Sequence, residues 1–463
     1  MKFLPLIWAA LWRKKARTVF TLLSIVVAFL LFGMLQGVNA AFNSAVDRAN
    51  VNRLMVANAT AFTESLPYAY LTQIESVPGV SAVSQQSWFG GYYQDPKNFF
   101  ANEAVSPNFI DAYPEWRMSD AERAERCRFV MKFQQLTGPV MAKGVEDTAF
   151  YIDNRLLALN EVGGDPGRFG VSVAEFHQEN LARQRRWPDN LLTSSTHDTK
   201  RSEDVRARIT VLSEFPHEWR AGVARWSRLN RKHRSRIDGE PAPDRNDEYR
   251  FYQTLLGAWP WNGEDPDEQF ITRIEAFMLK AAREAQMHTS WVNPDEAYEN
   301  AVRQFVRGAL DPGQQRAFLD DIATMRAVVA HIGVFNALSQ QLLKLTVPGV
   351  PDLYQGTELW HQRLVDPDNR EPVDYAAHAR LLATLDVTSP DEEFARDLLA
   401  SAPDGRIKLF LTARALHYRA AHPGLFRHGD YTPVNTAGAA AEHVVAFTRG
   451  HSGQEIVVAV PRL

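Results

Sequence analysis

The pattern of hydrophobic and polar positions sets the first residues apart from the rest of the chain. An uncharged apolar run extends from Val19 to Val38, and a basic cluster precedes it at positions 13–17. This run is long enough to span a bilayer as one helix, and the basic cluster predicts a cytoplasmic amino terminus. A cleaved signal peptide is the alternative, because Val38-Asn39-Ala40 resembles a small-residue cleavage site. Residues 1–41 are therefore predicted to be a membrane helix or a signal-like segment.

Residues 42–120 alternate short apolar and polar stretches. A helical pattern covers 67–74, and a turn at Pro78-Gly79 then leads into a strand-like stretch. We expect a small mixed α/β segment, outside the cytoplasm if the membrane helix is present.

The pattern changes from about residue 128, where residues 129–137 predict a helix. Farther along, residues 191–195 are typical of a short buried strand, with His197 and Asp198 at its end. Ser202 is a favourable helix N-cap, and apolar residues follow it at helical spacing. A strand, a His-Asp pair and a helix form one βα unit, and barrel enzymes carry their catalytic residues at this end of their strands.

The region from Val205 to Leu345 is predicted to be mainly helical. Two helices have clear apolar faces, one capped near Asp267 and containing Phe270 and Ile274, the other containing Phe305. A second strand-like piece covers 345–354, and no apolar run of membrane-spanning length is expected after the first. The last part, 401–463, predicts a helix over 405–422 and strands over 431–434, 443–449 and 455–460, which is the start of a small β domain.

Composition narrows the possible functions. The formal net charge is −4, which argues against a protein that binds nucleic acid through a strongly basic surface. A basic run from Arg225 to Arg236 is better explained as a solvated surface. The single cysteine, Cys127, excludes an intramolecular disulfide framework and a multi-cysteine metal site. We expect no metal and no cofactor.

Polar residues follow both predicted strands of the second part. After the strand at 345–354 come Glu358 and the loop 366–375, which contains carboxylates, an arginine and an aromatic residue. Carboxylates accept hydrogen bonds from sugar hydroxyls, and aromatic rings cover the C–H faces of sugars, so these residues favour a polyol-binding cleft. Helix caps and surface ion pairs are an equally acceptable explanation.

The motifs from about 128 to 463 resemble maltooligosyl trehalose synthase, a family of the alpha-amylase superfamily. The resemblance rests on five stretches: Gly-Pro-Val-Met-Ala-Lys-Gly-Val-Glu-Asp-Thr-Ala-Phe-Tyr (138–151), Asn-Glu-Val-Gly-Gly-Asp-Pro (160–166), Ser-Thr-His-Asp-Thr-Lys-Arg-Ser-Glu-Asp-Val-Arg-Ala-Arg (195–208), Pro-Gly-Val-Pro-Asp-Leu-Tyr-Gln-Gly-Thr-Glu-Leu-Trp (348–360) and Val-Asp-Pro-Asp-Asn-Arg (365–370). It implies an isomerase that converts the reducing-end α-1,4 bond of a maltooligosaccharide to an α,α-1,1 bond. Such an enzyme is expected in the cytoplasm.

The resemblance also implies roles for individual residues. Asp198 is the expected catalytic residue, which stabilises the transition state by holding ring hydroxyls. The expected substrate-binding residues are His197, Lys200, Arg201, Lys143, Glu146, Tyr354, Glu358, Asp368 and Arg370. The fold implied for 128–400 is an incomplete (β/α)8 barrel with a large helical insertion, because only the last strands of a barrel are accounted for.

The nucleophile and the acid/base of this family lie on earlier barrel strands. Residues 1–127 contain no Asp-Gly-Leu-Arg-Ile-Asp type of strand end, so this chain is expected to be inactive by itself. Instead, residues 1–120 resemble macrolide-export-type ABC transporter permeases, through Ile-Glu-Ser-Val-Pro-Gly-Val-Ser-Ala-Val at 74–83. This resemblance implies a membrane contact through 19–38 and an ABC ATPase partner. The alternatives are a truncated permease or a non-native fusion that joins the two parts near 117–128.

Overall fold

The computed structural model divides into two compact units, Met1–Met131 and Lys132–Leu463. It describes short stretches between residues 26 and 113, and residues 120–462 except 262, 264 and 386–390. The predicted membrane segment falls mostly outside the described residues. The described positions within it are 26, 29, 30, 32–34 and 36, and all of them are helical and exposed. The membrane helix stays a prediction.

The described part of the first unit has mixed α/β character, as its sequence predicts. Helix α3 spans Ala69–Glu75. Two short antiparallel strand pairs follow: β1 (Gln86–Trp88) with β4 (Glu103–Val105), and β2 (Gly91–Tyr92) with β3 (Phe99–Phe100).

The second unit begins within helix α5 (Asp120–Met141), and further helical segments follow closely in the chain. The predicted helix at 129–137 is part of α5, which leads into a π-helical segment at Ala142–Ala149 and into α6 (Phe150–Ile152). After a long loop comes α7 (Val173–Arg186), which begins with a capping box between Ser172 and Glu175. The loop before α7 contains the turn-rich motif at 160–166.

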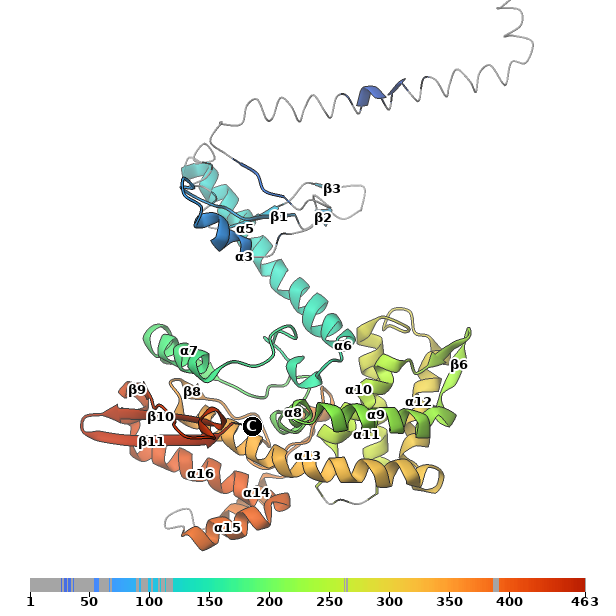
Figure 1. Cartoon of the computed structure of the whole chain (residues 1–463), viewed down its shortest axis with the longest axis vertical. Helices are drawn as coiled ribbons and strands as arrows, with labels where there is room; N and C mark the ends of the chain where they lie inside the picture. The colour runs from blue at the N-terminus through green and yellow to red at the C-terminus, as the bar shows by residue number, and fades with distance from the viewer. Residues whose placement is uncertain are drawn as a thin grey trace, which may run out of the picture. The chain divides into compact units, whose positions relative to one another are not determined.

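A block of helices makes up one side of this unit, on the right in Figure 1, which confirms the predicted helical region. Its helices are α8 (Glu203–Thr210), α9 (Pro216–Leu229), α10 (Arg245–Ala258), α11 (Glu268–Ala285), α12 (Glu296–Leu310) and α13 (Pro312–Thr346). A hairpin of β6 (Ser235–Ile237) and β7 (Glu240–Ala242) interrupts them. The Asp267 side chain caps α11 by accepting a hydrogen bond from the amide of Phe270, as predicted. Phe270, Ile274 and Phe305 are buried in one core cluster.

Helix α13 corrects one expectation from the sequence. By length and composition it is apolar enough to span a membrane, although no such run was expected after residue 38. Phe318, Ile322 and Val329 of this helix are buried in the core cluster with α8–α12. A core helix passes the same test of length and composition, so α13 is weak evidence for a membrane span.

The strand predicted at 191–195 is present but short, as β5 (Leu191–Leu192). It pairs in parallel with β8 (Val350–Pro351), and Leu191 lies opposite Val350. The strand predicted at 345–354 is wrong in extent, because α13 continues to Thr346 and only Val350–Pro351 is extended. An apolar run cannot be assigned to a strand rather than a buried helix by periodicity alone, and Leu345 is buried on α13.

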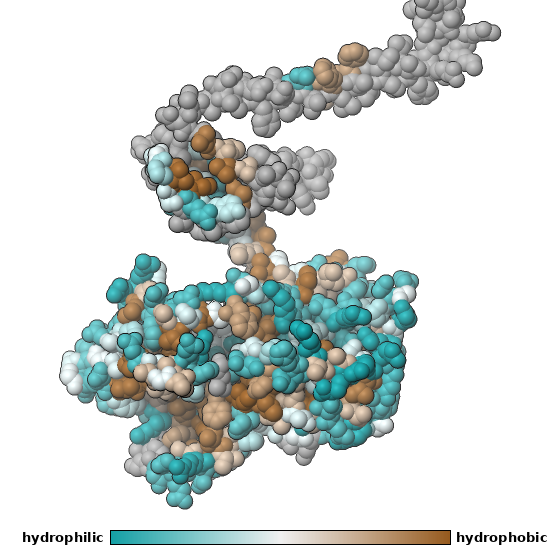
Figure 2. Space-filling model, in the orientation of Figure 1, coloured by the Kyte–Doolittle hydropathy of each residue, from teal (hydrophilic) through white to brown (hydrophobic). Residues whose placement is uncertain are grey.

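The last part of the chain adds helices and an antiparallel sheet. The helices are α14 (Tyr375–Ala383), α15 (Glu392–Ala400), α16 (Arg406–Ala421) and α17 (Pro423–His428). The sheet has the order β11-β10-β9, formed by Gln454–Pro461, Val444–His451 and Asp430–Pro433. The predicted helix at 405–422 and the three predicted strands are therefore confirmed. Figure 2 shows a largely hydrophilic face for this unit, with hydrophobic side chains reaching it near α13 and α16.

Candidate active site

The loop between β5 and α8 carries the predicted His-Asp pair. His197 and Asp198 form an exposed turn, whereas the next three residues, Thr199 to Arg201, are buried. The backbone amide of Asp198 donates a hydrogen bond to the hydroxyl of Thr196 at 3.1 Å. Within the described part of the chain, the Asp198 carboxylate makes no hydrogen bond or ion pair. It is therefore free to accept hydrogen bonds from a ligand.

A residue that the sequence analysis did not select, Glu161, holds this loop. Its carboxylate accepts hydrogen bonds from the backbone amides of Lys200 at 2.8 Å and Arg201 at 3.2 Å. It also forms an ion pair with Arg206 at 3.0 Å, and its side chain is only 12% exposed. The only signal in the sequence was its place in the 160–166 motif. Glu161 fixes the backbone immediately after the His-Asp pair.

Lys200 and Lys143 share one carboxylate. Lys200 Nζ lies 2.8 Å from Asp147 and is buried, and the exposed Lys143 Nζ lies 2.5 Å from the other oxygen of Asp147. Burial opposes ionisation of Asp147, but the hydrogen bonds from Lys143 and Lys200 outweigh it and lower its pKa. Glu146 is half-buried and accepts a hydrogen bond from the amide of Gly163. In this arrangement Lys200 connects the loop to the π-helical segment.

Arg201 is fully buried, and its guanidinium group lies over the ring of Phe277 at 5.5 Å. Two of its nitrogens, Nε and Nη2, have no hydrogen-bond partner among the described residues. Burial lowers its pKa to about 10, so the group stays charged at neutral pH. A buried donor without an acceptor is costly, and Arg201 is only 1% exposed, so this structure gives its predicted role in substrate binding no accessible donor.

The second loop, after β8, contacts the first through Asn369. The amide of Asn369 donates to the carbonyl oxygen of His197 at 3.0 Å, and the Tyr354 hydroxyl donates to the carbonyl oxygen of Asn369 at 3.1 Å. Tyr354 is thus connected to the His-Asp turn through one residue. Asn369 was quoted in a motif but was not selected as a site residue. Glu358 lies apart from this chain of contacts, 3.7 Å from His378.

Asp368 is the centre of an ion-pair cluster. It accepts hydrogen bonds from Arg273 at 2.8 Å, from Arg363 at 3.1 Å and from the amide of Leu364 at 2.7 Å. Burial would raise its pKa, but Arg273 outweighs burial and the pKa is lowered. Arg370 is exposed, and its guanidinium lies 3.7 Å from Asp366. The carboxylate of Asp368 is therefore bonded to groups of the protein itself.

The first turn of α8 differs from the prediction. Ser202 is the N-cap residue, but its side chain makes no capping hydrogen bond and instead donates to the carbonyl oxygen of His361. Glu203 and Asp204 are buried rather than solvated. Lys408 of α16 lies 2.7 Å from Glu203 and 2.9 Å from Asp204, and Lys344 of α13 lies 3.2 Å from Glu203. Tertiary contacts therefore replace the local cap.

These charges depend on one another. Burial opposes ionisation of Glu203, but the two lysines outweigh it and lower its pKa to about 2. Burial raises the pKa of Asp204, which shares Lys408 with Glu203. The carboxylate pair on α8 is thus held by cations from α13 and α16, and the Ser194 hydroxyl, at the start of the loop with Asp198, donates a hydrogen bond to Glu203.

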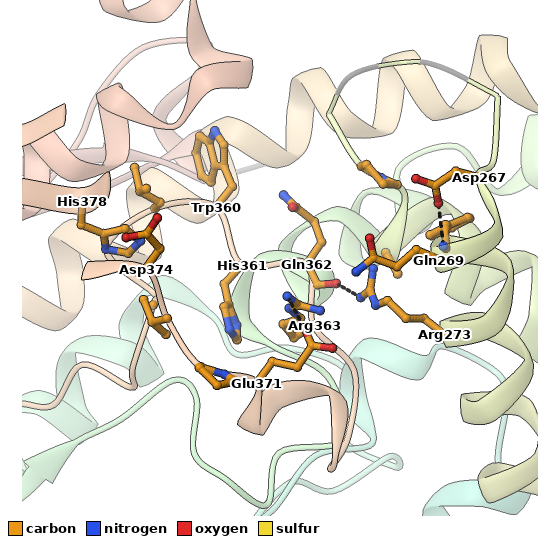
Figure 3. A pocket seen from close by; sticks show the side chains of 17 residues that line it. Asp267, Gln269, Arg273, Trp360, His361, Gln362, Arg363, Glu371, Asp374 and His378 are labelled. Atoms are coloured by element: carbon orange, nitrogen blue, oxygen red, sulfur yellow. Dashed lines mark hydrogen bonds and ion pairs between the residues drawn. The ribbon is translucent and has the colours of Figure 1, made fainter. Parts of the chain in front are cut away.

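A cavity of about 390 Å³ lies elsewhere in the same unit (Figure 3). Its walls come from the start of α11, from residues 356–363 and from residues 371–378. None of the predicted site residues lines it.

Among the described residues, no group of three or more His, Cys, Asp or Glu side chains is placed to hold a metal ion. Arg225 and Arg234 of the basic run pair with Asp321 and Glu248.

Comparison with known proteins finds relatives that cover most of this chain. Over 335 residues the chain is 43% identical to a Mycobacterium tuberculosis protein assigned as a maltooligosyl trehalose synthase. The chain is similar to maltooligosyl trehalose synthases. The match covers 72% of this chain and 39% of the relative, so the chain spans well under half of its length.

Solved structures agree with this similarity. The maltooligosyltrehalose synthase from Arthrobacter ramosus is 40% identical, with a TM-score of 0.61 over 72% of this chain and 40% of that one. Another maltooligosyl trehalose synthase is 32% identical, with a TM-score of 0.63 over 77% of this chain and 50% of that one. No protein-family model matches the chain. Nothing in these comparisons supports a transporter permease.

Proposed function

We propose that residues 132–463 supply the Asp198 part of a maltooligosyl trehalose synthase-like site. The reaction of such a site moves a reducing-end glucose from an α-1,4 to an α,α-1,1 bond within one maltooligosaccharide. The similarity to synthases at 40–43% identity supports this proposal. The observation that carries it is the exposed, unpaired Asp198 carboxylate. Glu161 fixes the loop of Asp198 by accepting hydrogen bonds from the backbone amides of Lys200 and Arg201.

Asp198 serves this chemistry by holding ring hydroxyls rather than by attacking the sugar. Its carboxylate accepts hydrogen bonds, which strengthen as charge develops on the ring in the oxocarbenium-like transition state. His197 flanks it as a substrate-binding group. Lys200 contributes chiefly by fixing the loop through Asp147.

We also propose that β5, β8 and the helices between them are part of a (β/α)8 barrel. The parallel pairing of β5 and β8, with helices between them in the chain, supports their assignment as neighbouring strands of a (β/α)8 barrel. Retaining transfer needs a nucleophile and an acid/base about 5–5.5 Å apart. Residues 1–127 lack the strand-end motif that carries these groups in the resembling family. We therefore expect this chain alone to bind a maltooligosaccharide without converting it.

Calorimetric titration of the full chain with maltohexaose, together with product analysis, tests the proposal. Binding should be detected, Asp198→Asn should weaken it, and the exposed Asp189→Asn should leave it unchanged as a matched control. Losing a hydrogen bond to a charged group raises Kd by about 10- to 150-fold. Equal affinity for Asp198→Asn and the wild type would refute the role of Asp198. A trehalose-terminated product would refute the expected inactivity.

The interpretation of residues 1–120 has weaker support. A synthase-like function fits the cytoplasm, whereas the predicted helix at 19–38 would put the second unit on the other side of a membrane. A permease-like segment with an ABC ATPase partner, or a fusion of unrelated parts, stays a prediction from the sequence. Sequencing genomic DNA across codons 110–135 distinguishes a fusion from an assembly error.

A further inference from the structure

The cavity in Figure 3 lies between the first turns of α11 and two loop segments. Asp267, Gln269 and Arg273 line one side, and Trp360 and His378 belong to the other. A volume of about 390 Å³ falls at the small end of ligand pockets, which measure about 300–1,000 Å³. Asp198 does not line this cavity. Two of the predicted substrate-binding residues lie next to it, because Glu358 is near the lining residue His378 and Asp368 pairs with the lining residue Arg273.

The indole ring of Trp360 provides a fixed aromatic wall. Its Nε1 donates a hydrogen bond to the carbonyl oxygen of Ala402 at 2.6 Å. Its ring also packs near that of Trp261, with centroids 5.6 Å apart. The polar edge of the indole is therefore satisfied within the protein. What the ring adds to the cavity wall is apolar surface.

Several polar groups of the cavity walls lack partners. Gln362 Nε2, His361 Nδ1 and His378 Nδ1 have no hydrogen-bond partner among the described residues, although all three atoms are buried. Buried polar atoms are usually paired, and leaving them unpaired is costly. In Figure 3 the Gln362 side chain extends between Trp360 and the α11 residues, and its backbone oxygen is held by Arg273 at 2.8 Å.

His378 adds a second polar position. Its Nδ1 lies 3.7 Å from Glu358 Oε2, which is also buried without a hydrogen-bond partner. That separation is too long for a direct hydrogen bond but suits a bridging hydroxyl or water. A hydroxyl at this position would satisfy both atoms.

The charges in the cavity disfavour an anion. Arg273 and Arg363 both pair with Asp368, and Arg363 also pairs with Glu371 at 2.5 Å. None of the described lining residues is a lysine, and both arginines of the lining are paired with carboxylates. Burial lowers the pKa of His361 to about 4, which keeps its imidazole neutral at pH 7.

We propose that this cavity is a second carbohydrate site, which binds a neutral polyhydroxylated ring of the glucose type. The ring packs against Trp360. Gln362 Nε2, His378 Nδ1 and Glu358 Oε2 are buried in this structure, so these side chains rotate toward the cavity to bond the hydroxyls of the ring. This proposal does not rest on the catalytic role of Asp198, because Asp198 does not line the cavity. Of the predicted substrate-binding residues, it uses Glu358.

Fluorine NMR of the full chain labelled with 5-fluorotryptophan tests this proposal. The signal of Trp360, assigned through Trp360→Phe, should shift on titration with maltose, and that of the exposed Trp187 should not. Gln362→Ala removes one hydrogen bond and should raise the Kd seen at Trp360 about 2- to 12-fold. The exposed Gln178→Ala is its matched control. Gln269→Phe, at an exposed lining position, should block the shift without disturbing the core.

The remaining titrations identify the ligand and the site. Asp198→Asn should leave the maltose response of Trp360 unchanged, even though it weakens maltohexaose binding at the first site. Loss of the Trp360 shift in Asp198→Asn would overturn the proposal of a separate site. A Trp360 signal that does not respond to maltose would overturn the proposal itself. A response to inorganic phosphate but not to maltose would do the same, since it would identify an anion site.

Discussion

The ammonium group of Lys408 lies 2.9 Å from both carboxylate oxygens of Asp204, and both side chains are buried. The two residues are 204 positions apart in the chain. Asp204 also accepts a hydrogen bond from the backbone amide of His361 at 2.7 Å. One buried carboxylate thus joins the start of α8 to α16 and to the loop that follows β8.

Lys408→Met should destabilise the second unit strongly. The substitution removes the cation shared by Glu203 and Asp204 and leaves buried carboxylates with less compensation. Breaking a buried ion pair from one side typically costs about 3–5 kcal/mol. Chemical denaturation should show this loss of unfolding free energy, whereas the exposed Lys132→Met should change it little. Equal stability of Lys408→Met and the wild type would mean that the pair is dispensable.

The stability of the protein should depend on pH through His361. Burial is the main cause that lowers its pKa from 6.5 to about 4. Below pH 6.5 the unfolded chain binds a proton at this residue, and the folded chain does not until about pH 4. The free energy of unfolding therefore falls as pH decreases through this window, by about 3 kcal/mol in total.

His361→Gln removes the titrating group and should flatten this part of the pH profile, measured by denaturation at several pH values between 4 and 7. His217→Gln provides the control, because His217 is an exposed histidine on α9. If both variants keep the slope of the wild type, another group causes the pH dependence.

Glu161→Gln should loosen the turn that carries Asp198. The amide side chain offers only one acceptor oxygen, so the backbone amides of Lys200 and Arg201 cannot both be satisfied as they are now. Hydrogen exchange should become faster at these amides, and maltohexaose binding should weaken. Glu179→Gln removes an exposed surface ion pair instead and should change neither property. Unaltered exchange in Glu161→Gln would contradict the positioning role.

Gly349→Ala should disturb the pairing of β5 with β8. Gly349 has φ +129°, and an added Cβ would lie 2.7 Å from Leu192 and 2.9 Å from the carbonyl oxygen of Asn190. Gly170 also has a positive φ, of +69°, but open space around its Cα. Gly170→Ala therefore measures the backbone cost alone, about 1–2 kcal/mol. Thermal unfolding should show a further loss of about 1–3 kcal/mol for Gly349→Ala because of the clash.

Local signals predicted the helices well and the second strand poorly. Asp267 caps α11, and Phe270 begins the buried face of this helix three residues later. Both the cap and the start of the buried face are therefore visible in the sequence. The stretch 345–354 is apolar throughout, and its division between α13 and β8 follows from packing. Leu345 continues the buried face of α13, whereas Val350 is extended because it pairs with Leu191.

The candidate site divides in the same way. The motif at 195–208 identified Asp198, but it gave no sign that Lys200 is buried against Asp147. Nor did it indicate that Glu161, 39 positions away, binds the backbone of Lys200. Lys143 and Arg370, selected with the motif, are exposed residues paired with nearby carboxylates.

By itself, the sequence of this protein determined which region is helical, where α11 begins, the extent of the helix at 405–422, and which motif contains the His-Asp turn. Periodicity and capping act within a few neighbouring residues, so they are visible in the chain. Only the tertiary structure decided that Glu203 and Asp204 are buried partners of Lys408 and Lys344 rather than solvated residues of a helix start. The reason is that the cations come from helices more than a hundred residues away, and burial makes their charge decisive.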